Sequence, residues 1–363
     1  MTTKKKKRLV SLDLLRGLTV AMMILVNNGY GESFSQLRHV EWNGMTVCDL
    51  VFPFFLFMVG VSTYLSLRKT QFKPTPYVLR KIFKRTVLLF LIGLGINWFD
   101  HAIGGDVLCF GHLRIWAVLQ RIALCYLAAS LFAIYANHKY TIPTIAGLLV
   151  VYTLIITLCN GYACDAGANI LAQVDLRLFG YDHLYHKSPV DPEGLVSTLP
   201  AIAHTMIGFL CGKLVCSKTS PNKKVLNIFT IGALLTIAGF VLSIWLPLNK
   251  RIWSPSFVLA TCGLAMLLLS LIIKIEQWSP SAMNKGFGVA LLVFGMNPLF
   301  LYVLSEFMAI IFGHFGISSI IFDGIHSVIS DPKWASLCYA LTFVLLNWLV
   351  GYVLYRKKIF IKI

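Results

Sequence analysis

The stretch that decides the fold is LVFPFFLFMVGVSTYLS, residues 50–66, in which no position carries a charge. Extended to residues 47–67, this run is close to the roughly 20 apolar residues that an α-helix needs to cross about 30 Å of hydrocarbon. It therefore predicts a membrane-spanning helix.

Similar apolar runs recur along the whole chain. Of its 363 residues, 57% are hydrophobic and 13% are charged, and the mean hydropathy is +0.75, far from the composition of soluble domains. Spans are predicted at residues 9–29, 47–67, 80–98, 115–136, 141–160, 195–215, 225–246, 255–274, 286–306 and 335–355. We expect an all-α polytopic membrane helix bundle of about ten transmembrane helices, with residues 1–363 forming a single transmembrane domain.

The net charge of +17 is sorted by connection rather than spread over a surface. Basic residues gather before the first span, in the connections 68–85 and 213–224, and after the last span, where the groups include Lys4–Arg8 and Arg356–Lys358 with Lys362. Alternate connections are acidic instead. Since basic loops face the cytoplasm, both termini are expected to be cytoplasmic and His39 to lie outside. Membrane lipid is an expected partner, and nucleic acid is not.

The first span is expected to remain in the mature protein, because it contains Asp13 and Arg16 and lacks a small-residue cleavage site. Three of the nine cysteines, Cys109, Cys159 and Cys164, are expected near the outer side, where a disulfide is left open. The cysteines show no metal-ligand spacing, and no metal is expected.

Charged residues within spans are informative, because each costs at least about 2.5–3.5 kcal/mol unless it is paired or lines a polar cavity. Asp13 and Arg16 stand three positions apart and share a helix face. They form either a structural ion pair or part of a cytoplasm-facing cavity that binds an anion. Arg121, beside Gln120, has no partner nearby in sequence, and a phosphate-bearing ligand would satisfy it.

A second group of polar residues lies at the outer mouth of the 47–67 span. It comprises His39, Trp42, Asn43 and Asp49, with Asn27 at the outer end of the first span. A lone loop histidine is usually only solvated, but here a carboxylate is close enough in sequence to orient the imidazole. A histidine, an amide and a carboxylate together can deprotonate a nucleophile and stabilise an oxyanion. The residue chemistry predicts an outward-facing acyltransferase or hydrolase site.

Several longer stretches carry a resemblance to one family. They are Ser11–Gly17, Leu25–Asn27, His39–Gly60, Val118–Arg121, Tyr181–Tyr185, Asp191–Gly194, Asn249–Lys250 with Trp253–Ser254, Gly295–Asn297 and Tyr355–Lys362. In them the chain resembles the transmembrane acetyltransferase family of the heparan-α-glucosaminide N-acetyltransferases, over nearly its whole length. The resemblance implies transfer of acetyl from cytosolic acetyl-CoA to an amino sugar on the far side of the membrane.

The resemblance also implies the site residues. The family's catalytic histidine falls on His39, as base or acetyl carrier, with Asn27 and Asp49 beside it. Acetyl-CoA, a co-substrate, is expected to contact Arg16, Arg85, Gln120, Arg121, Asn249, Lys250, Trp253 and Ser254. The amino sugar is expected to contact Trp42, Asn43, Asp191 and Glu193. Alternatively, Asp191–Gly194 caps the following span. An extended pantetheine arm, on the order of 15–20 Å, covers about half of the hydrocarbon, so the thioester can approach His39 from inside.

Two departures from the family leave the acceptor open. The chain begins directly at the first core helix, whereas the best-known family members have a large luminal domain and an extra leading span, and its outer loop between the fifth and sixth spans is shorter. The short lysine-rich N-terminus suggests a bacterial inner-membrane protein. The acceptor is then a periplasmic or lipid-linked glycan, or a glycosaminoglycan fragment.

Two other functions are kept as alternatives. A glycan O-acyltransferase would also use His39 as base but would need no carboxylates to bind an ammonium group. A non-catalytic transporter of a sugar or acyl compound would have a midplane polar site and often inverted repeats, neither of which the sequence shows. Whether the protein forms a homodimer is left open.

Overall fold

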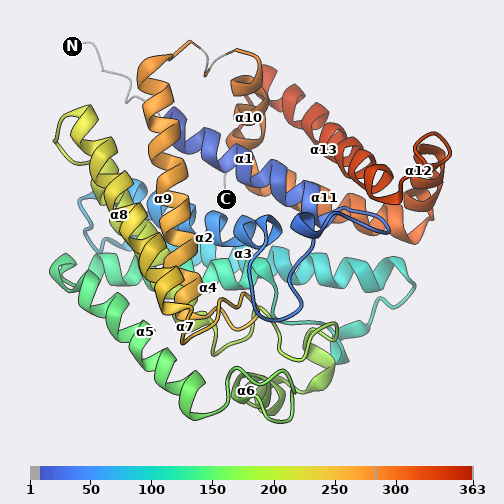
Figure 1. Cartoon of the computed structure of the whole chain (residues 1–363), viewed down its shortest axis with the longest axis horizontal. Coiled ribbons are helices and arrows are strands. Elements are labelled where there is room, and N and C mark those ends of the chain that lie inside the picture. Colours follow the sequence, from blue (N-terminus) through green and yellow to red (C-terminus); the bar gives the residue numbers. More distant parts are fainter. Residues whose placement is uncertain (1–8, 282, 284, 362–363) are drawn as a thin grey trace.

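A computed structural model of the chain describes residues 9–281, 283 and 285–361, and every regular element within these residues is helical (Figure 1). The basic residues Lys4–Arg8 and Lys362, used above for orientation, lie outside the described residues. The α-helices are α1 (Val10–Asn27), α2 (Val47–Leu67), α3 (Pro76–Ile103), α4 (Val118–Tyr135), α5 (Thr141–Leu158), α6 (Ile170–Phe179), α7 (Thr198–Val215), α8 (Pro221–Leu242), α9 (Pro255–Trp278), α10 (Phe287–Met296), α11 (Pro298–His314), α12 (Ile317–His326) and α13 (Pro332–Arg356).

Nine of the described helices are long and apolar enough to cross a membrane, namely α1 to α5, α7 to α9 and α13. They confirm nine of the predicted spans, with α3 longer than residues 80–98 at both ends. The tenth predicted span, 286–306, was wrong as a single straight helix, since α10 and α11 are bent by 84° at Asn297. Pro298 has no N–H with which to continue the hydrogen bonding of α10, which accounts for the break. Counted as one broken span, the pair brings the total to ten.

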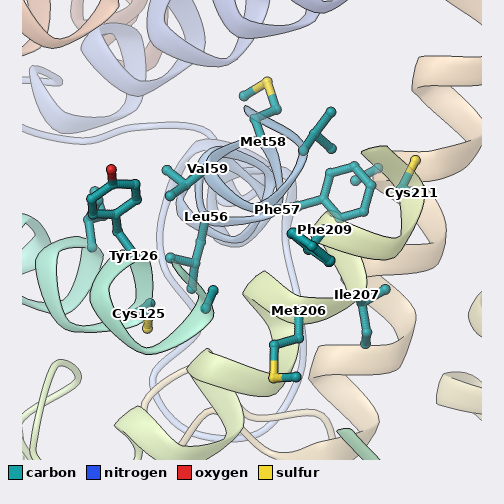
Figure 2. Close-up of a cluster of buried hydrophobic side chains, with 14 of the residues drawn as sticks. Leu56, Phe57, Met58, Val59, Cys125, Tyr126, Met206, Ile207, Phe209 and Cys211 are labelled. Carbon is teal, nitrogen blue, oxygen red and sulfur yellow. The ribbon is translucent and has the colours of Figure 1, made fainter. Parts of the chain in front are cut away.

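The core of the bundle is built around α2, which packs on α7 through two glycines. A Cβ atom at Gly60 would lie 1.9 Å from the carbonyl oxygen of Thr205, and one at Gly208 would lie 2.1 Å from that of Phe57. The two backbones are thus in direct contact, a common packing mode in membranes. Figure 2 shows side chains of α2, such as Leu56, between α4 and α7.

Both described ends of the chain lie at the same end of the bundle. The Asn297 side chain accepts a hydrogen bond from the backbone N–H of Ile361 (2.9 Å) and donates one to the carbonyl of Ile359 (3.0 Å). Leu9 and Phe360 line one hollow of about 930 Å³. This arrangement agrees with an even number of crossings.

Two further features concern the connection after α5 and the cysteines. The long connection after α5 contains a short helix, α6, whose first turn is capped by Asn169. All nine cysteines are free, so Cys109, Cys159 and Cys164 form no disulfide in this structure.

Candidate active site

The start of α2 fixes the carboxylate that holds the predicted catalytic histidine. Thr46 and Asp49 form a capping box, in which Asp49 Oδ2 accepts from the Thr46 backbone N–H (3.1 Å) and hydroxyl (3.0 Å). The other carboxylate oxygen, Oδ1, lies 2.7 Å from His39 Nδ1. The Asp49 side chain is almost fully buried, whereas that of His39 is 48% exposed. With its proton on Nδ1, toward Asp49, the imidazole would have Nε2 as its basic nitrogen, and the Lys250 Nζ atom lies 3.4 Å from that nitrogen.

Lys250 completes this group from a distant loop. Its Nζ atom lies 3.0 Å from His39 Nδ1 and 3.5 Å from Asp49 Oδ1. Asn249 holds the loop in place, because its side chain donates to Asn43 Oδ1 (3.1 Å) and its backbone N–H donates to Ser254 Oγ (3.0 Å). The His39 imidazole therefore contacts both an ammonium group, from Lys250, and a carboxylate, from Asp49.

The three groups face a pocket of about 180 Å³. It is lined by His39, Val40, Trp42, Gly44, Asp49, Arg114, Tyr185, Pro192, Glu193, Lys250 and Arg251. Of the four residues predicted to contact the amino sugar, two line this pocket and two do not. Trp42 and Glu193 line the pocket, while Asn43 and Asp191 brace the loops behind it.

Arg114 organises the acidic side of the pocket. One of its nitrogens, Nη2, donates to Asp191 Oδ1 (3.0 Å) and to Glu193 Oε2 (2.9 Å), and its guanidinium lies 4.4 Å from the centre of the Tyr185 ring. Burial acts to lower the pKa of Arg114, but the attraction of Glu193 and Asp191 outweighs it and raises that pKa. The guanidinium therefore stays cationic. The alternative that Asp191–Gly194 caps the next span was wrong, because α7 begins at Thr198.

A larger cavity, about 680 Å³, lies among α2, α3, α4 and α11. It is lined mostly by apolar side chains, with Arg16, Ser62 and Arg85 as its polar groups. Its lining on α3 runs from Arg85 to Phe99, fourteen positions and hence roughly 20 Å along the helix. A hollow of about 930 Å³, which includes Arg68 and Lys69, shares Arg16 and Ser62 with this cavity. The cationic groups thus border two adjoining spaces.

The two arginines of the cavity are held differently. Arg16 pairs with Asp13 (Nη1 to Oδ1, 3.0 Å) and donates to Ser62 Oγ (2.9 Å). It also lines the cavity. The two alternatives given for Arg16, an ion pair and a cavity-lining residue, are therefore compatible. Arg85 lies 4.6 Å over the Tyr126 ring, and its buried Nε has no hydrogen-bond partner among the described residues. A bound anion would satisfy it.

The structure places other predicted acetyl-CoA residues away from this cavity. Arg121 is fully buried and donates from Nη2 to the Gly194 carbonyl (3.0 Å) and to Ser197, at the start of α7. Gln120 is also fully buried, against Gly93. Neither residue lines the 680 Å³ cavity and the bundle encloses both, so their contact with acetyl-CoA stays a prediction.

Trp253 and Ser254 lie next to the loop that carries Lys250 and stabilise it by packing and by capping α9. The buried Trp253 ring lies 5.2 Å from the Arg121 guanidinium, and Ser254 caps α9 by accepting from the Phe257 N–H. Asn27 is exposed and donates to Glu306 of α11 (3.4 Å), and it does not line the His39 pocket. These three predicted residues therefore contact protein groups rather than either open space.

Sequence reasoning missed Arg114, Tyr185, Arg251 and Cys48, whose Sγ lies 3.2 Å from His39 Nδ1. A signal existed for Arg114, because it is a basic residue in a connection on the otherwise acidic side.

The fold, the His39 pocket and the 680 Å³ cavity define a class, that of multi-pass membrane proteins with an imidazole and carboxylate pair at one end of the bundle and an arginine-lined cavity within it. The family model described as heparan-alpha-glucosaminide N-acetyltransferase, catalytic, matches residues 8–247, and the chain belongs to this family. The predicted resemblance is thereby confirmed.

Two curated relatives are both described as heparan-alpha-glucosaminide N-acetyltransferase. The human protein is 28% identical over an alignment that covers 98% of this chain and 60% of the relative. The mouse protein is 27% identical with the same coverage. The chain thus spans about 60% of the length of these relatives.

Proposed function

We propose that this protein transfers acetyl from acetyl-CoA to the amino group of a glucosamine-like sugar, with the two substrates entering from opposite ends of the bundle. One observation carries the proposal. His39 is held by Asp49 at the first turn of α2, whereas Arg16 is held by Ser62, thirteen positions or roughly 20 Å further along the same helix.

The donor would occupy the arginine end. The phosphates of acetyl-CoA would lie against Arg16 and Arg85, with Arg68 and Lys69 nearby, because phosphate is recognised by charge-assisted hydrogen bonds. Its pantetheine arm would lie in the apolar 680 Å³ cavity, whose volume is within the range of ligand sites. We take this end as cytoplasmic and the His39 end as periplasmic, with the chain in a bacterial inner membrane as one catalytic domain.

The acceptor would occupy the His39 pocket. His39 Nε2 takes a proton from the sugar amine, and the amine nitrogen attacks the thioester carbonyl carbon. The carbon–sulfur bond then breaks, CoA leaves as a thiolate, and the imidazolium returns the proton to it. Asp49 stabilises the imidazolium, and the Lys250 ammonium is placed to stabilise the developing oxyanion. Transfer is direct, in a ternary complex.

A sugar hydroxyl is a second candidate acceptor, and one observation favours it. Arg114 already pairs with both Asp191 and Glu193, so those carboxylates need no ammonium ligand. Glucosamine and N-acetylglucosamine separate the candidates, because only the hydroxyls of N-acetylglucosamine can be acetylated.

Binding of acetyl-CoA to the purified protein tests the proposal. A ligand that binds only the native state raises its melting temperature by mass action, so the melting temperature in detergent should rise with acetyl-CoA. Labelled acetyl should then appear on glucosamine. Absence of any shift at millimolar acetyl-CoA would contradict the proposal and favour a transporter.

A further inference from the structure

Three side chains of metal-ligating type converge outside the His39 pocket, the 680 Å³ cavity and the 930 Å³ hollow. His101 lies in the last turn of α3, and Asp106 and His112 lie in the connection to α4. A ligand atom of each lies within 4.8 Å of those of the other two. His112 Nε2 is 2.7 Å from Asp106 Oδ2, and the two imidazole rings are 5.1 Å apart between centroids.

The backbone brings the three together by a tight turn. The N–H groups of Gly104 and Asp106 both donate to the carbonyl of His101 (3.1 Å each). Gly105 has a φ of +95°, a conformation that glycine adopts without strain. The short helix Cys109–Gly111 then returns the chain to His112, anchored by the fully buried Cys109. The geometry is therefore set by local chain folding.

The donor set has a chemical preference. Two imidazoles and one carboxylate suit zinc and related transition-metal ions better than calcium or magnesium. Zinc with three protein ligands keeps a fourth position for water, which fits the exposed side of this cluster, where Asp106 and His112 are about half exposed. Ligand distances of about 2.0–2.2 Å place the ligand atoms of a tetrahedral ion roughly 3.4 Å from one another. The 2.7 Å pair of His112 and Asp106 must therefore open, and any wider pair within the 4.8 Å limit must close.

We propose that His101, Asp106 and His112 form a binding site for a divalent transition-metal ion, with zinc as the preferred occupant. The site acts on the connection that carries Arg114, two positions after His112. That connection is already tied to α3 by Asn97, which donates to the Arg114 carbonyl (2.8 Å), and by Trp98, which donates to the Val107 carbonyl (3.0 Å). A bound ion adds a third tie and holds Arg114 against Asp191 and Glu193.

Calorimetric titration with Zn²⁺, on full-length protein purified without a histidine tag and treated with chelator, tests this site. Wild type should bind one ion per chain, and His101→Ala with His112→Ala should abolish this binding. His326→Ala is the matched control, because His326 is exposed on α12 outside the cluster, and it should bind as wild type does. Co²⁺ should give the visible absorption of a tetrahedral ion in wild type and in the control only.

Two results would overturn the proposal. One is unchanged stoichiometry in the double variant, and the other is the absence of binding by folded wild type. A double variant that fails to fold is replaced by Asp106→Asn, which keeps side-chain size and should weaken Zn²⁺ binding at least tenfold. Zn²⁺ should also raise the melting temperature of wild type but not of these variants, a readout independent of acetyl transfer.

Discussion

The His39 pocket and the arginine-lined cavity differ in how they use charge. In the pocket of about 180 Å³, the imidazole, carboxylate and ammonium of His39, Asp49 and Lys250 meet within 3.5 Å. In the cavity of about 680 Å³, two arginines stand among apolar side chains. Pre-aligned opposite charges suit proton transfer, whereas arginines in an apolar cavity suit binding of an anion. Under the proposed function, chemistry and binding of the acetyl donor would therefore be separated along the helices.

Replacement of His39 should give the largest effect. His39→Gln should lower kcat for acetyl transfer by roughly 10²–10⁴-fold, the usual effect of a lost acid–base group. Binding of acetyl-CoA should stay intact, because the side chain is half-exposed and belongs to the other space. His326→Gln, an exposed histidine on α12, is the control for protein quality. Steady-state kinetics with a thermal-shift assay measure both quantities.

Replacement of Arg85 tests the proposed role of the arginine-lined cavity in binding acetyl-CoA. Arg85→Met should raise KM for acetyl-CoA about tenfold, the effect of one lost charge-assisted hydrogen bond, and leave kcat at saturation within about twofold. Arg80→Met, on the same helix but exposed, should change neither. If His39→Gln kept its turnover while Arg85→Met lost it at saturation, the chemistry would lie at the arginine end.

A smaller effect is expected from Asp175, which braces the loop behind the His39 pocket. Its Oδ1 accepts from the Leu195 N–H (3.0 Å), and burial raises its pKa to about 6. The folded state therefore retains a proton that the unfolded chain loses near pH 4, so stability falls as pH rises from about 4 to 6. Asp175→Asn should remove this contribution and raise the melting temperature by a few degrees at pH 8 but not at pH 4.

Melting curves of both proteins across this pH range check the sign. An equal shift at both pH values would mean that Asp175 acts through packing rather than through its charge.

The sequence was most informative where neighbours in the chain are neighbours in space. His39 and Asp49 are ten positions apart, and the capping box that sets Asp49 is itself local, so this pair could be predicted. The long apolar runs likewise defined the spans. The break at Asn297 was missed because hydrophobicity continues through it, although Pro298 was a local signal.

Contacts between distant segments could not be predicted in this way. Arg114 meets Asp191 across 77 positions, and Arg121 meets Gly194 across 73. Arg121 donates to a carbonyl and a hydroxyl, but like Arg85 it has a buried Nε without a partner among the described residues. Only Arg85 lines the 680 Å³ cavity, and the local sequence does not show this difference. Tertiary packing alone distinguishes Arg121 from Arg85.

The central claim, that acetyl passes from one end of the bundle to the other, is tested most directly in sealed vesicles. The orientation of the protein in the vesicles is measured with cysteine variants at two exposed positions, Lys73→Cys and Gln36→Cys. Both are made in protein without the exposed Cys159 and Cys164. In vesicles where an impermeant thiol reagent labels position 73 but not 36, acetyl-CoA is added outside and glucosamine is enclosed inside. We predict acetylated glucosamine inside the vesicles. Product that forms only when both substrates share one side would contradict the claim.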